Sequence, residues 1–306
     1  MKAIFIFSGQ GAQSVGMGRD LAGVSAAAQR IFAEADRILD RKLSDLIFNG
    51  PIEELTRSTN CQTAIYTMSC AALAAFREKF DLQPVACAGL SLGEYGALYA
   101  AGAFDFGTGL KLLDRRGALM DEACEKFPGT MASVLGGDPA VIESVCREID
   151  LDVANYNCPG QLVLSGPREK IELAAAQLKE KEGVRKVVPL TVAGGFHSRL
   201  MREAGEKLRP ALAAAGITMP QVPVYHNFTA KVSGTAEEIR DALAEQVSGS
   251  VRWEECLRHA ISDLGVDTAI EFGPGNVLTG LVKRIDPAIV RINVNSAETL
   301  SQIVLN

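Results

Sequence analysis

Ala86-Cys87-Ala88-Gly89-Leu90-Ser91-Leu92-Gly93-Glu94-Tyr95 carries the clearest structural signal in this chain of 306 residues. A short apolar run, Val85–Ala88, ends in Gly-x-Ser-x-Gly and leads into a helix-forming segment at about 94–101. This order is typical of a nucleophile elbow, in which a serine lies on a tight strand-to-helix turn with its hydroxyl exposed. We expect both glycines to be required, because a Cβ at either position would clash in such a turn.

Apolar runs and helical patterns alternate on both sides of this turn. The pattern predicts a first strand at Ile4–Phe7 and helices at Asp20–Leu39, at about Cys61–Phe80 and at Asp105–Cys124. The alternation resumes near the end of the chain, with strands at 222–225, 268–271 and 290–294 and helices at 235–247, 253–264 and 277–285. Such βα alternation predicts an α/β fold with a largely parallel sheet covered by helices.

A different pattern interrupts this alternation. We expect strands at 130–135, 153–157, 161–165 and 185–191, with helices at 139–149 and 168–182. The order β-α-β-β-α-β is that of a ferredoxin-like unit. The sequence therefore predicts a discontinuous large domain, residues 1–127 and 193–306, with an inserted ferredoxin-like subdomain at 128–192.

Composition limits the classes of function. The net charge of −6 argues against nucleic acid as a partner, because phosphate binding needs a basic face. No apolar run approaches the roughly 18–20 residues of a membrane span. The seven scattered cysteines, without a CxxC pair, favour buried free thiols over a disulfide or zinc framework. We expect a soluble cytoplasmic protein that binds neither membrane nor metal.

A serine nucleophile needs a base, and the chain has three histidines. His197 is the best candidate, because it lies in a glycine-bearing loop, where catalytic groups are common. His259 falls in an amphipathic helix and His226 ends a short strand, so surface and core roles suit them better. No aspartate or glutamate stands out as a third member, which leaves a backbone carbonyl as the alternative partner for the imidazole.

Two backbone amides and one arginine are further candidates. The amide of Leu92, at the start of the helix after Ser91, suits an oxyanion. Gly9-Gln10-Gly11 follows the first strand and lacks the third glycine of a dinucleotide motif, so the Gln10 amide fits better as a second oxyanion donor. Arg116 follows Arg115 on a helix, either as part of a solvated pair or as a guanidinium that grips a carboxylate of the acyl group.

Taken together, these residues match a known family. The chain resembles malonyl-CoA:acyl carrier protein transacylases of fatty acid synthesis and the related acyltransferase domains of polyketide synthases. The resemblance runs almost from end to end and rests on seven segments: Phe7-Ser8-Gly9-Gln10-Gly11-Ala12-Gln13, Gly89-Leu90-Ser91-Leu92-Gly93-Glu94-Tyr95, Arg116-Gly117-Ala118-Leu119-Met120, Asn155-Tyr156-Asn157-Cys158-Pro159-Gly160-Gln161, Gly195-Phe196-His197-Ser198-Arg199-Leu200-Met201, Glu271-Phe272-Gly273-Pro274-Gly275 and Leu278-Thr279-Gly280-Leu281.

The resemblance implies a ping-pong reaction and an α/β-hydrolase-like core with a ferredoxin-like subdomain. Ser91 would take the malonyl group from malonyl-CoA, with His197 as base, and pass it to the phosphopantetheine thiol of acyl carrier protein. Arg116 would pair with the malonyl carboxylate, and the main-chain carbonyl of Gln246 would orient the histidine. The Gln10 and Leu92 amides would hold the oxyanion, and no cofactor is implied.

The acyl pocket implied by the resemblance includes Leu90, Met120 and Phe196. Leu90 stands where the family usually has histidine, which removes a polar group beside the nucleophile. Ser8 stands where the family often has proline. Phe196 is similar to the form seen in malonyl-selective members, because its ring would crowd a 2-methyl branch. One pocket residue shifts selectivity by only about 1–3 kcal/mol.

Three alternatives remain open from the sequence. The chain could be a trans-acting acyltransferase of polyketide synthesis, a thioesterase or esterase on the same elbow, or a weakly active docking subunit. The carrier protein is acidic throughout this family, so a basic patch is expected at the mouth of the site. Arg185-Lys186 and Lys283-Arg284 are candidates for that patch, or else ordinary surface charge.

Overall fold

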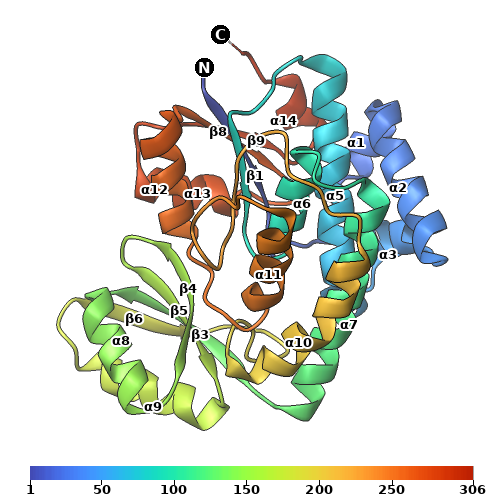
Figure 1. The fold of residues 1–306 in the computed structure, drawn as a ribbon. Coiled ribbons are helices and arrows are strands. Elements are labelled where there is room, and N and C mark those ends of the chain that lie inside the picture. Colours follow the sequence, from blue (N-terminus) through green and yellow to red (C-terminus); the bar gives the residue numbers. More distant parts are fainter. Residues whose placement is uncertain (306) are drawn as a thin grey trace.

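A five-stranded parallel sheet forms the centre of the computed structural model, which describes residues 1–305 (Figure 1). Its strand order is β7-β2-β1-β8-β9. The strands are β1 (Ala3–Phe7), β2 (Ala86–Gly89), β7 (Val224–Tyr225), β8 (Thr268–Phe272) and β9 (Val290–Val294). Each neighbouring pair is parallel, as the βα alternation predicts.

Helices cover both faces of this sheet because its strands are apolar on both sides. Phe5 and Phe7 of β1 pack into one core cluster, and Ile4 and Ile6 pack into the other. The first cluster includes α1 (Arg19–Val24), α2 (Ala26–Leu39), α3 (Leu43–Asn49), α4 (Ile52–Thr56), α5 (Ser58–Lys79), α6 (Gly93–Ala100), α7 (Phe106–Lys126), α10 (Arg202–Ala214), α11 (Ala236–Gln246) and α14 (Ala297–Ser301). The second includes α12 (Trp253–Leu264) and α13 (Val277–Ile285).

A separate antiparallel sheet of four strands has the order β4-β5-β3-β6. Its elements are β3 (Thr130–Gly136), α8 (Pro139–Glu148), β4 (Asp152–Cys158), β5 (Gln161–Gly166), α9 (Arg168–Lys179) and β6 (Val184–Pro189). The two helices share a third core cluster with one face of this sheet. The predicted α/β fold class, with its βαββαβ unit, is confirmed, while the domain boundaries at 127/128 and 192/193 stay a prediction.

One predicted helix is wrong as a single element. Asp20–Leu39 is divided at Ser25, whose extended backbone (φ −129°) ends α1 and whose hydroxyl accepts a hydrogen bond from the Ala28 N–H to begin α2. Serine is a preferred N-cap residue, and here its hydroxyl also donates to Glu78 at 2.7 Å. The sequence pattern also left out α3, α4, α10, α14 and the short 3₁₀ turn Arg199–Met201.

The small sheet packs against the end of the parallel sheet at which the elbow lies. The Tyr156 N–H donates to the Val251 carbonyl, and the Val251 N–H donates to the Ala154 carbonyl. Arg199 pairs with Asp152 at 2.8 Å, which ties the loop after His197 to β4. Over residues 1–305, no helix is both long enough and apolar enough to cross a membrane.

Candidate active site

The backbone around Ser91 forms a nucleophile elbow. A Cβ on Gly89 would lie 2.0 Å from the Gly93 carbonyl carbon, and one on Gly93 would lie 2.2 Å from the Phe7 oxygen. Ser91 itself has φ +54°, a left-handed conformation that a non-glycine residue adopts only when its surroundings hold it there. Both glycines are therefore needed for close backbone approach, and the turn presents the serine hydroxyl beyond the end of β2.

Ser91 and His197 are in direct contact, in the arrangement that a nucleophile and its general base require. Ser91 Oγ lies 2.8 Å from His197 Nε2, and His197 Nδ1 lies 2.8 Å from the main-chain oxygen of Gln246. Since a carbonyl only accepts, Nδ1 carries the proton and donates it, which leaves Nε2 to accept from the serine. No aspartate or glutamate contacts this imidazole within the described residues.

Burial and the nearby Arg116 charge lower the pKa of His197 from 6.5 to about 4, although its hydrogen bond to Gln246 acts in the opposite direction. The imidazole is therefore neutral at pH 7. A neutral imidazole is the form that accepts the serine proton.

Arg116 is a buried cation directly beside the nucleophile. Its side chain is 1 % exposed, and burial lowers its pKa. Its Nη2 donates to Ser91 Oγ at 3.1 Å and to Gln246 Oε1 at 3.0 Å, while its Nη1 donates to Gln62 Oε1 at 2.6 Å. In the described residues all its direct partners are neutral, and its Nε has no partner. Such a cation is costly to bury unless an anion compensates it.

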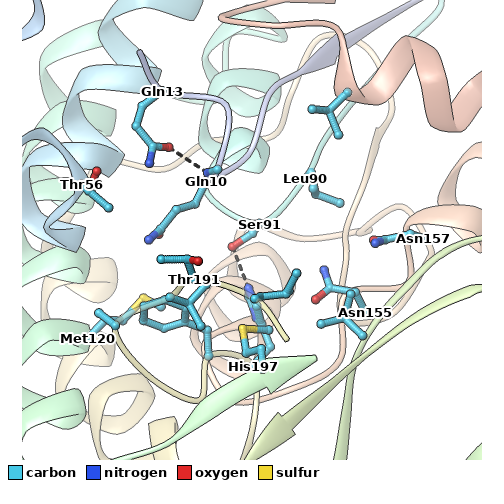
Figure 2. Close-up of a pocket in the computed structure, with 18 residues that line it drawn as sticks. Gln10, Gln13, Thr56, Leu90, Ser91, Met120, Asn155, Asn157, Thr191 and His197 are labelled. Atoms are coloured by element: carbon cyan, nitrogen blue, oxygen red, sulfur yellow. Dashed lines mark hydrogen bonds between the residues drawn. The ribbon is translucent and has the colours of Figure 1, made fainter. Parts of the chain in front are cut away.

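A cavity of about 230 Å³ opens in front of the serine. Figure 2 shows Ser91 and His197 facing each other, with Gln10 on one side and Leu90 and Asn155 on the other. Most of the wall is apolar, and much of it comes from β3, β5 and the segment after β6: Met131, Val163, Leu190, Val192 and Ala193. The active site thus lies between the two sheets.

Two backbone amides lie at the start of the chain segments that follow β1 and β2. In residues 1–305 neither the Gln10 nor the Leu92 N–H donates a hydrogen bond to another protein group. Gln10 lines the cavity. The neighbouring Gly11 is held in place because its N–H donates to Gln13 Oε1 at 2.8 Å. This arrangement supports the predicted oxyanion role for both amides.

The structure brings all the predicted site residues close to Ser91, in two layers. Six of them line the cavity: Gln10, Leu90, Ser91, Met120, Phe196 and His197. Leu92, Arg116 and Gln246 are buried behind its wall. Of the other histidines, His226 is buried and its Nδ1–H donates to Glu94 Oε1 at 2.7 Å. His259 is half-buried, with its Nδ1 at 2.8 Å from the Ala230 carbonyl oxygen.

Three residues of the buried layer were not among the predicted site residues: Gln62, Glu94 and Asn227. Gln62 holds Arg116, as described above. Asn227 accepts from the Ser91 N–H at 2.6 Å and donates to the Gly89 carbonyl at 2.8 Å. Glu94 accepts from the Asn227 N–H and from the Gln246 side chain. All three are fully buried polar residues, and a polar residue within an apolar helix was the only signal available for Gln62 and Glu94.

A family model supports this chemistry independently of the geometry. The model of the acyl transferase domain matches residues 4–296. The chain belongs to the acyl transferase family. This match spans both sheets and every residue of the candidate site, including Ser91 and His197, which are 106 residues apart in the sequence.

Individual proteins resemble this acyl transferase over nearly their whole length. A malonyl CoA-acyl carrier protein transacylase of Bacillus subtilis is 43 % identical over 98 % of this chain and 95 % of its own. The crystal structure of an acyl-carrier-protein S-malonyltransferase from Burkholderia pseudomallei has a TM-score of 0.94 at 39 % identity, covering 99 % of both chains. A malonyl-transacylase solved in complex with a type II PKS acyl-carrier protein gives 0.94 at 37 % identity, covering 98 % of both chains.

Proposed function

We propose that this acyl transferase moves the malonyl group of malonyl-CoA to the phosphopantetheine thiol of an acyl carrier protein. One observation carries the choice of acyl group: the buried Arg116 guanidinium, 3.1 Å from Ser91 Oγ, has no anionic partner among residues 1–305. In a malonyl ester of Ser91, a single methylene group separates the ester carbonyl from the free carboxylate, so this carboxylate stays close to Oγ and can pair with the guanidinium. The names of the relatives support the same substrate pair.

In the loading step, Ser91 Oγ attacks the thioester carbonyl of malonyl-CoA while His197 Nε2 takes the hydroxyl proton. The Gln10 and Leu92 N–H groups donate to the oxyanion of the tetrahedral intermediate. The C–S bond then breaks, and His197 returns the proton to the CoA sulfur. The product is a malonyl ester on Ser91, with its carboxylate against Arg116.

In the transfer step, the same groups work in reverse. The pantetheine thiol of the carrier protein gives its proton to His197, and its sulfur attacks the ester carbonyl. The C–O bond to Ser91 breaks, and His197 returns the proton to Oγ. The energy of the substrate thioester is conserved in the product thioester, so this proposal requires no cofactor.

The role of His197 differs from that in a hydrolase triad. Its Nδ1 donates to the neutral carbonyl of Gln246, whereas a triad aspartate would supply a negative charge. This difference favours transfer over a thioesterase or esterase activity. We propose that the malonyl units enter fatty acid synthesis, and a polyketide pathway is the second candidate, because one solved neighbour is bound to a polyketide carrier protein.

The test is intact-mass detection of the acyl-enzyme. Wild-type protein mixed with malonyl-CoA should gain one malonyl group and lose it when the carrier protein is added, with the malonyl group recovered on the carrier. Ser91→Ala should gain none. Malonate release at the same rate with and without carrier protein would instead identify a thioesterase.

A further inference from the structure

Glu94 lies at the centre of a fully buried hydrogen-bond network behind the nucleophile. Its Oε1 is 2.7 Å from His226 Nδ1, and its Oε2 accepts from the Asn227 N–H at 2.8 Å and from Gln246 Nε2 at 2.7 Å. The Glu94 side chain is fully buried, with about 1 % of its surface exposed. A carboxylate only accepts hydrogen bonds, so it suits a place on which these N–H groups converge.

The Gln246 side chain connects this carboxylate to Arg116. Gln246 Oε1 accepts from Arg116 Nη2 at 3.0 Å, while its Nε2 donates to Glu94 and to the Ser91 carbonyl, the latter at 3.0 Å. A guanidinium only donates and a carboxylate only accepts, so the amide fits in one orientation alone. The reversed amide would set two donors against each other at Arg116 and two acceptors against each other at Glu94.

We propose that Glu94 is a positioning residue for acyl selectivity. By fixing the Gln246 amide, it keeps a hydrogen-bond acceptor on Arg116 Nη2 and so holds the guanidinium in place for the acyl carboxylate. This inference rests on the proposed malonyl transfer. Glu94 touches no substrate, because it acts only through the amide of Gln246.

A second path from Glu94 reaches the reaction without passing through Arg116. Glu94 accepts from the Asn227 N–H, and Asn227 Oδ1 accepts from the Ser91 N–H at 2.6 Å. Loss of that path would disturb the elbow and slow the loading of every acyl group to the same extent. Loss of the Gln246 path would slow malonyl loading more than acetyl loading. The ratio of the two kcat/KM values therefore isolates the selectivity role.

The experiment measures loading from malonyl-CoA and from acetyl-CoA in the full-length protein, with thermal melts of each variant. Glu94→Ala should lower the malonyl-to-acetyl ratio at least tenfold. Glu94→Gln should keep most of the ratio, because its amide oxygen can accept from Asn227 and Gln246 while its NH₂ faces His226. Glu271→Ala is the matched control, since Glu271 is a buried carboxylate that accepts main-chain N–H groups from Leu278 and Thr279.

The possible outcomes separate the two proposals. A wild-type ratio near one would contradict the proposed malonyl function itself. A high wild-type ratio that a folded Glu94→Ala variant keeps, or that Glu271→Ala lowers equally, would overturn the role of Glu94 alone. If Glu94→Ala does not fold, Glu94→Asp takes its place: the carboxylate is shorter by one carbon and should lower the ratio, and an unchanged ratio would refute the inference.

Discussion

Replacement of Arg116 by methionine should remove the preference for malonyl over acetyl groups that the proposed function assigns to this site. Methionine keeps most of the length of the side chain and removes the charge. In the wild type, the guanidinium is 1 % exposed, and its direct partners are two amide oxygens and the Ser91 hydroxyl. The malonyl carboxylate would thus lose its only cationic partner in a desolvated site.

The size of the effect follows from that burial. Removal of one partner of a buried charge pair costs about 3–5 kcal/mol. At about 1.4 kcal/mol per factor of ten, kcat/KM for malonyl-CoA should fall by about 100- to 4,000-fold. Acetyl-CoA has no carboxylate, so its loading should change far less. Folding should suffer little, because the unpaired Gln62 and Gln246 oxygens are offset by the removal of a buried ion.

The assay is single-turnover loading of Ser91, followed by intact mass for both acyl donors, with a thermal melt as the check on folding. Arg115→Met is the control, because Arg115 is the neighbouring residue and is exposed. An equal loss for malonyl and acetyl groups would refute the assignment of Arg116 as the carboxylate receptor. The same loss in Arg115→Met would refute it as well.

Further predictions concern pH, the elbow and the carrier protein. Since the pKa of His197 is lowered to about 4, malonyl loading should stay level from pH 8 to about pH 5.5 and halve near pH 4; an activity midpoint near 6.5 would contradict this. The same shift should reduce stability as pH falls from about 6.5 to 4, because the unfolded chain binds the His197 proton first, and denaturant melts across that range will measure it. Gly89→Ala should lower the free energy of unfolding by about 3 kcal/mol or more, as measured by chemical denaturation. Gly216→Ala is the control: no atom lies within 4 Å of the added Cβ, so the free energy of unfolding should change by less than about 0.5 kcal/mol. Lys283→Glu should raise KM for the acidic carrier protein severalfold at low salt and leave malonyl-CoA loading unchanged. Lys79→Glu is the control, because Lys79 is also exposed. Equal effects of the two variants would exclude a docking role for Lys283.

The parts of the site that local sequence could predict are those fixed by local backbone geometry. Gly89 and Gly93 surround a serine between a buried strand and a helix, and this short pattern determines the elbow by steric contact alone. The nine strands were also predicted within a few residues, because most of them are short apolar runs with clear boundaries. Ser25 shows the limit of such patterns: the apolar periodicity continues across it, but its hydroxyl caps a new helix.

The buried layer of the site could not be predicted from local pattern, because its contacts depend on the assembled fold. Gln62 meets Arg116 across 54 residues, and Asn227 meets Ser91 across 136. Apart from its place in a largely apolar helix, nothing near Gln62 in the sequence distinguishes it from a polar residue on a helix surface. Only the packing of α5 against α7, close enough that a Cβ on Gly117 would lie 2.6 Å from Thr59 Cα, turns its side chain toward the guanidinium.

Among the described residues, no carboxylate contacts His197 and none pairs with the Arg116 guanidinium, and both facts have the same physical explanation. Gln246 contacts both side chains, with its carbonyl on His197 and its side-chain oxygen on Arg116. A carboxylate at that point would pair with the guanidinium and compete with the carboxylate of the acyl group. The neutral amide holds both residues without neutralising Arg116, and the Glu94 charge stays one hydrogen bond further away. The neutral Gln246 thus orients His197 without an anion and leaves the Arg116 cation available for the acyl carboxylate that we propose it binds.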